Sequence, residues 1–145
     1  MAPKEYIGAL VVEAAETRLL EVVELNDFAR DARRIFTEAE IAEMLQHFGM
    51  FRQLGNVIQG TGGLRKARWS AAGKGKRSGA RVIYYYGGDH MPIYMVAIYS
   101  KSEKVDMTPA EKKAATKFVA ATKRSFEAKR ARAPQLRVVK GKGRR

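Results

Sequence analysis

The sequence predicts an α+β domain in which a small antiparallel sheet of about four strands carries two N-terminal helices on one face, followed by a C-terminal helix. Two observations predict this class: helical patterns stand before and after a run of strand-like segments, and the links within that run are short. The 145 residues suit a single core. We expect an N-terminal extension over 1–18, the folded domain over 19–128 and a flexible basic tail over 129–145.

The N-terminal part of this domain is expected to contain one strand and two helices. Residues 19–25 are apolar and rich in β-branched side chains, which favours a strand. Asn26 is the expected cap of the next helix, whose apolar side chains recur at helical spacing. Thr37 and Glu40 have the spacing of a capping box, so a second helix is predicted to begin there.

Three strands are then predicted over 63–70, 80–87 and 92–99, and short links make them antiparallel neighbours. A second capping box, Thr108 with Glu111, places the start of the last helix, with Pro109 at its first position. Strand alternation sorts the side chains into two faces but does not say which face meets the helices. Leu64, Lys66, Arg68 and Ser70 share one face of the first strand, and Arg81, Ile83 and Tyr85 share one face of the second.

Positive charge is the unusual property of the sequence. The net charge is +13, with 28 Lys and Arg against 15 Asp and Glu, which favours a polyanionic partner. Two segments make the imbalance: residues 65–81 hold seven basic and no acidic side chains, and residues 123–145 hold ten basic and one acidic. The first segment alternates charge with Trp69 and strand-like positions, which indicates an ordered cationic surface, whereas the second is typical of a tail that adds non-specific affinity for RNA.

Several classes of function have little support. The chain has no cysteine, which excludes disulfides and cysteine-based metal sites and favours a reducing, cytoplasmic compartment. Its longest uncharged run has 12 residues, fewer than the roughly 18 of a membrane span, and its start lacks a signal-peptide pattern. The glycine-rich segments fit neither nucleotide-binding motif, and His47 and His90 lack metal-ligand spacing, so we expect neither a cofactor nor a metal.

The stretch from Gly55 to Lys101 resembles the RelE/HigB-type toxins of bacterial type II toxin–antitoxin systems. The segments that carry the resemblance are GNVIQGTGGLRKARW, GKGKRSGARVIYYY and IYMVAIYSKSEKVDMT, which give in order a glycine turn, a basic strand, a glycine-lysine hairpin, an aromatic strand led by Arg81 and a strand end with Tyr-x-Lys. The resemblance implies an endoribonuclease that cuts messenger RNA in the ribosomal A site. It also implies a partner antitoxin, for which a helix-turn-helix fold is expected.

The basic residues suit RNA cleavage without a metal. Attack of the ribose 2′-hydroxyl on the adjacent phosphate requires a base, an acid and positive charge around the phosphorane. We expect the catalytic residues to be Lys66, Arg68, Arg81 and Lys101, with Arg81 clamping the phosphate. Family members often place Tyr or His after the last strand, where this chain has Met107 and Thr108, so the general acid is unidentified; Tyr99 is a weak substitute. The expected RNA contacts are Arg65, Lys74, Lys76, Arg77, Tyr85 and Tyr99, although the tyrosines also suit cross-strand packing.

Two other functions fit parts of the same evidence. A non-catalytic RNA-binding or ribosome-associated module would need only the positive charge. A toxin that poisons DNA gyrase on the same scaffold would need no phosphate site on the sheet, so Lys66, Arg68 and Arg81 argue against it. Cuts positioned by codon on translated messages would distinguish the nuclease from both.

Overall fold

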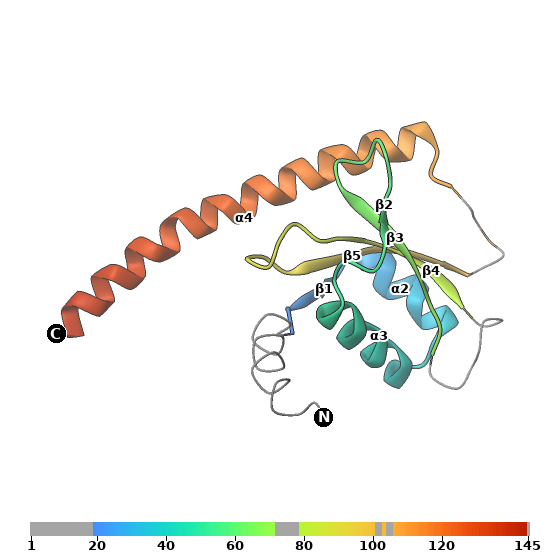
Figure 1. Cartoon of the computed structure of the whole chain (residues 1–145), viewed down its shortest axis with the longest axis horizontal. Coiled ribbons are helices and arrows are strands. Elements are labelled where there is room, and N and C mark those ends of the chain that lie inside the picture. The colour runs from blue at the N-terminus through green and yellow to red at the C-terminus, as the bar shows by residue number, and fades with distance from the viewer. Residues whose placement is uncertain (1–18, 72–78, 101–102, 104–105, 145) are drawn as a thin grey trace, which may run out of the picture.

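The protein is an α+β domain with helices on both sides of one sheet. The computed structural model describes residues 19–71, 79–100, 103 and 106–144. Helices α2 (Asn26–Ile35) and α3 (Glu38–Met50) lie on one side of the sheet, and the first part of α4 (Pro109–Arg144) lies across the other side (Figure 1). The predicted class and the order of the elements are confirmed.

Across the described residues the sheet has five strands and is mixed, which corrects the prediction of about four antiparallel strands. Its order is β1-β5-β4-β3-β2, with β1 (Val22–Glu24), β2 (Asn56–Val57), β3 (Leu64–Trp69), β4 (Ala80–Tyr85) and β5 (Ile93–Ser100). The pairs β3–β4 and β4–β5 are antiparallel as predicted, whereas β1 runs parallel to β5. Strand β2 was missed because two residues are too short to show an alternating pattern.

The sheet face formed by Ala80, Val82 and Tyr84 packs against α2 and α3. Strand alternation alone had not shown which face meets these helices. The side chains of Phe28, Ile41, Met44 and Phe48 fill this core, and all are at most 1% exposed. Tyr84 lies at the centre of the same cluster, where the Gly55 N–H donates to its hydroxyl at 2.8 Å and the hydroxyl donates to the Arg52 carbonyl at 3.1 Å. The opposite face, with Lys66 and Arg81, is therefore directed away from α2 and α3.

A second apolar cluster joins the other sheet face to α4. Leu64, Ile83 and Tyr85 from the strands pack with Ala115 and Val119 of the helix. The turn before β3 lies against α4, and Gly60 and Gly62 have φ values of 81° and 80°, a conformation that favours glycine. The Thr116 hydroxyl also donates to the Gly60 carbonyl at 3.0 Å. Helix α4 thus covers one end of this face.

The helix starts agree with the predictions except at α2. In both capping boxes the acidic side chain accepts from the cap N–H, at 2.9 Å for Thr37 with Glu40 and at 2.8 Å for Thr108 with Glu111. Asn26, however, is the first residue of α2, and Leu25 is the cap without a side-chain hydrogen bond. The physical reason is that the Leu25 N–H donates to the Met95 carbonyl at 3.0 Å, so the chain passes from the sheet directly into the helix.

Helix α4 is longer than predicted. The sequence indicated a helix end that runs into a tail broken by Pro134, but α4 continues to Arg144. Alanine, lysine and arginine, which are frequent after residue 109, favour helix, whereas a proline within a helix lacks an N–H donor and its ring crowds the preceding turn. The C-terminal part of α4 leads away from the sheet (Figure 1).

Candidate functional site

The sheet face that α4 only partly covers carries three of the predicted basic residues. Lys66 and Arg68 come from β3 and Arg81 from β4, and strand alternation directs all three to the side opposite α2 and α3. A bulge in the β4–β5 pairing near Ile83 adds one residue to β5, so that Val96 and Ala97 both lie in the second cluster. The extra residue brings Tyr99 onto the face that holds Arg81.

Arg68, Arg81 and Tyr99 form a row across three strands. Arg68 is the pairing partner of Arg81, and Arg81 is the pairing partner of Tyr99. Directly opposed residues in such pairs have Cβ atoms about 4.5–5.5 Å apart. The side chains of Arg68 and Arg81 therefore leave the sheet at adjacent positions. The Arg68 side chain is exposed, whereas Arg81 and Tyr99 are half-buried.

A small pocket adjoins this row. It is lined by Ile58, Lys66, Arg81, Ile83, Tyr99, Asp106, Met107 and Lys112, and its volume is about 50 Å³. Since a water molecule needs roughly 10–15 Å³ of such space, the pocket has room for about three to five waters, comparable to the five heavy atoms of one phosphate group. It is much smaller than the roughly 300–1,000 Å³ of a site that encloses a small organic ligand.

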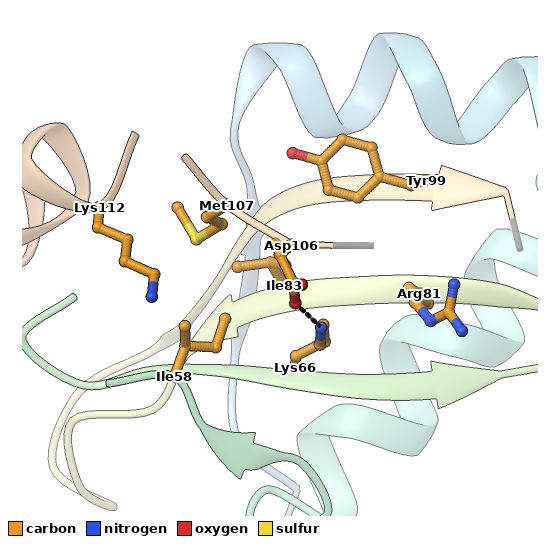
Figure 2. Close-up of a pocket in the computed structure, with 8 residues that line it drawn as sticks. All are labelled: Ile58, Lys66, Arg81, Ile83, Tyr99, Asp106, Met107 and Lys112. Atoms are coloured by element: carbon orange, nitrogen blue, oxygen red, sulfur yellow. Dashed lines mark ion pairs between the residues drawn. The ribbon is translucent and has the colours of Figure 1, made fainter. Parts of the chain in front are cut away.

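Charged side chains of both signs meet in the pocket. The Lys66 ammonium lies 3.7 Å from an oxygen of Asp106. Figure 2 shows this pair at the centre of the view, with Arg81 to one side of it and the Tyr99 ring above. The pair is accessible to solvent, because the Lys66 side chain is 32% exposed and the Asp106 side chain 82% exposed. The site therefore offers fixed positive charge beside a cavity that water can enter.

Two charged residues of the pocket, Asp106 and Lys112, were not among the predicted site residues. Both belong to the segment that opens α4, and their proximity to Lys66 depends on the docking of α4 on the sheet. The capping box of Thr108 and Glu111 was the available signal, because it places Lys112 in the first turn of the helix and Asp106 just before it. The capping box alone does not show that the start of the helix lies close to Lys66 on β3.

The structure separates the other predicted site residues. Arg65 lies on the opposite face of β3 from Lys66 and donates to the Gly55 carbonyl at 2.7 Å, which gives it a structural contact away from the pocket. Tyr85 is 5% exposed under α4, so its ring offers no open surface for stacking on a base. Four further predicted residues, Lys74, Lys76, Arg77 and Lys101, lie outside the described residues.

The two histidines contact aromatic rings. His47 lies on α3 with its ring centroid 5.4 Å from that of Phe48 and 5.2 Å from that of Phe51, and burial lowers its pKa. His90 lies 5.8 Å from the ring of Phe126. Within residues 19–71, 79–100, 103 and 106–144, no three side chains of the metal-ligating types come together.

A comparison of the sequence with models of known protein families finds no match. In the described part of the chain, no helix has both the length and the apolar character needed to cross a bilayer.

Proposed function

We propose that the protein is the toxin of a toxin–antitoxin system, an endonuclease that cuts messenger RNA on the ribosome and thereby inhibits translation. The observation that carries the proposal is the meeting of Lys66, Arg81 and Tyr99 around one phosphate-sized pocket, with Arg68 paired to Arg81 beside it. The resemblance of Gly55 to Lys101 to the RelE/HigB-type toxins supports the same activity. The proposed setting is the cytoplasm, where translating ribosomes and a helix-turn-helix antitoxin are the partners.

The arginines supply the phosphate clamp. A guanidinium group presents a fixed fork of donors that matches two phosphate oxygens, and it keeps its charge throughout the reaction. Arg81 lines the pocket and is held partly buried by its neighbours, so it binds the scissile phosphate. Arg68 is more exposed and binds an adjacent phosphate or the outer side of the same one. The favourable energy of this binding offsets the repulsion between the two arginines.

Lys66 and Tyr99 act on the reacting atoms. The 2′-hydroxyl attacks the adjacent phosphorus, its proton passes to a base, and the bond from phosphorus to the 5′-oxygen breaks as that oxygen takes up a proton. The products are a 2′,3′-cyclic phosphate and a 5′-hydroxyl. As an ammonium group, Lys66 stabilises the negative charge of the phosphorane. The Tyr99 hydroxyl is the proposed donor of the proton to the 5′-oxygen, because its ring lies over the pocket (Figure 2).

The shape of the site favours a polymer substrate. A cavity of about 50 Å³ admits a phosphate group but not a nucleotide, so the sugars and bases of a bound strand would lie across the open part of the sheet. Such a surface supplies few contacts that hold a flexible RNA in position. Dependence on the ribosome follows, because a messenger that is already positioned in the A site loses less entropy when it binds.

Arg81→Ala tests the proposal most directly. Loss of a preorganised charge at the scissile phosphate is expected to lower the rate of cleavage by about 10²- to 10³-fold. The measurement is the mapping of new 5′ ends on messengers in a purified translation reaction, where the wild-type protein produces cuts positioned by codon. Arg34→Ala is a matched control, because Arg34 lies on α2 behind the sheet and its side chain is 72% exposed.

Each result of this experiment has a separate meaning. Codon-positioned cuts by the wild type and by Arg34→Ala, but not by a folded Arg81→Ala variant, support the nuclease. Undiminished cutting by Arg81→Ala removes the proposed clamp. If the wild type binds RNA or ribosomes but produces no cuts, the nuclease is wrong and the protein is a non-catalytic RNA-binding module.

A further inference from the structure

An acidic side chain lies inside the cationic site, and the proposed chemistry does not use it. Asp106 lines the pocket together with Lys66, Arg81 and Lys112, and its carboxylate is 3.7 Å from the Lys66 ammonium. A carboxylate and a phosphate are both oxyanions that bind ammonium groups in the same way. Asp106 thus occupies a position suited to an RNA phosphate oxygen (Figure 2).

The position of Asp106 is set by the residues that follow it. Met107 is partly buried in the cluster beneath α4, which anchors the chain one residue later. Thr108 then caps α4, accepting from the Glu111 N–H at 3.1 Å through its hydroxyl and from the Lys112 N–H at 2.9 Å through its carbonyl. These contacts fix the backbone beside Asp106, and from that backbone position its carboxylate lies 3.7 Å from the Lys66 ammonium.

We infer that Asp106 is an internal competitor of the RNA phosphate and sets how tightly the site binds RNA. This inference rests on the proposed function in that RNA is the ligand. When a phosphate binds at Lys66, we expect the Asp106 carboxylate to turn toward solvent, because two anions beside one ammonium group repel each other. The exposure of Asp106 makes that turn possible without a change in the fold.

The expected effect is moderate. An ion pair as exposed as Lys66–Asp106 is weak, so its loss on RNA binding lowers affinity by about two- to fivefold. A competitor of this strength does not block a messenger that the ribosome holds in place. It does reduce binding of free RNA, which is abundant in a cell and would otherwise occupy a cationic surface of this kind.

The test compares two variants that remove the same charge from the same segment. Asp106→Asn removes the carboxylate beside Lys66, and Glu103→Gln removes an exposed carboxylate that accepts from the Ser100 N–H and does not line the pocket. The probe is a single-stranded RNA with 2′-O-methyl groups throughout, which binds but has no 2′-hydroxyl for attack. We expect Asp106→Asn to bind it about two- to fivefold more tightly than the wild type, and Glu103→Gln to change the Kd less.

A second pair of variants, made in a background without Lys66, assigns the effect to that residue. In a Lys66→Ala background, Asp106→Asn is expected to give no gain beyond that of Glu103→Gln, because the group for which carboxylate and phosphate compete is absent. Equal gains from Asp106→Asn and Glu103→Gln, a gain that persists without Lys66, or weaker binding by Asp106→Asn would each overturn the inference. Thermal unfolding of every variant verifies that the fold is retained.

The probe separates this inference from the proposed function. Because the modified RNA is not cleaved, the affinity change is measured whether or not the protein is a nuclease. A gain specific to Asp106→Asn together with an absence of codon-positioned cuts would retain the competitor and reject the nuclease. Codon-positioned cuts together with equal gains from Asp106→Asn and Glu103→Gln would retain the nuclease and reject the competitor.

Discussion

The two faces of β3 and β4 are built from alternating residues of the same strands, yet one face is mainly apolar and the other carries both apolar and charged side chains. The face toward α2 and α3 buries Val82 and Tyr84 completely. The face toward α4 is divided: Leu64 and Tyr85 are buried at one end, while Lys66, Arg68 and Arg81 lie toward the other. One face thus supplies most of the packing, and half of the other face is left available for charged side chains.

The arginines on the two sides of the sheet also have different neighbours. Arg33 of α2 donates to Glu24 at 2.6 Å and to Glu38 at 2.9 Å, so two carboxylates neutralise one guanidinium and raise its pKa. On the other side, Arg68 and Arg81 stand opposite each other in the β3–β4 pairing. On the first side two carboxylates bind one arginine, whereas on the second side two arginines are opposed across a strand pair beside the Lys66–Asp106 ion pair.

The largest expected effect concerns packing on the α2 and α3 face. Phe48 is fully buried with its ring centroid 5.0 Å from that of Tyr84, so Phe48→Ala should lower the free energy of unfolding by about 3–5 kcal/mol. Phe118 of α4 is only partly buried, and Phe118→Ala should cost less, within about 0.5–3 kcal/mol. Urea unfolding measures both values. A larger loss at Phe118 would reverse the ranking of the two faces.

A smaller effect is expected from the tyrosine beneath α4. Burial raises the pKa of Tyr85, and the Glu127 carboxylate adds to the shift. Above the unfolded pKa of about 10, the unfolded chain loses this proton while the folded state keeps it, so the stabilisation is full below pH 10 and is lost as the pH rises through the folded pKa. Tyr85→Phe should therefore lose less unfolding free energy than the wild type between about pH 9 and 11.

The comparison with Tyr85→Phe controls for the other groups that titrate in this range. Tyr84 and Tyr94 also have raised pKa values, mainly through burial, and they are present in both proteins. Urea unfolding at several pH values gives the two profiles. Parallel profiles would show that Tyr85 is open to water in solution and that α4 does not cover this end of the sheet.

The smallest effect tests the charged half directly. Because like charges directly opposed across strands are destabilising, Arg68→Ala should raise the free energy of unfolding by about 0.2–1 kcal/mol while it weakens RNA binding. Arg65→Ala is the matched control on the same strand. It removes the hydrogen bond to the Gly55 carbonyl, so it should lower the free energy of unfolding by about 0.5–1.5 kcal/mol.

Opposite signs at residues 65 and 68 would support a division of β3 between stability on one face and binding on the other. If Arg68→Ala destabilised the fold as much as Arg65→Ala, Arg68 would be a structural residue. Urea unfolding and titration with single-stranded RNA measure the two properties on the same samples.

Local patterns in the sequence determined most of the elements. Both capping boxes formed as predicted, because the cap and the acidic residue three positions later are close whenever a helix begins there. Alternation also sorted Lys66, Arg68 and Arg81 onto the correct strand faces, since it depends only on the extended backbone. These are short-range constraints, and they hold whatever the rest of the chain does.

Long-range packing decided the rest. The parallel pairing of β1 with β5, the choice of the face that meets α2 and α3, and the approach of Asp106 and Lys112 to Lys66 all join segments distant in the sequence. Such contacts depend on which apolar surfaces pack together, a cooperative choice that no short pattern contains. The amino-acid sequence thus determined which side chains carry the charge, and the tertiary structure decided which of them share one phosphate-sized pocket.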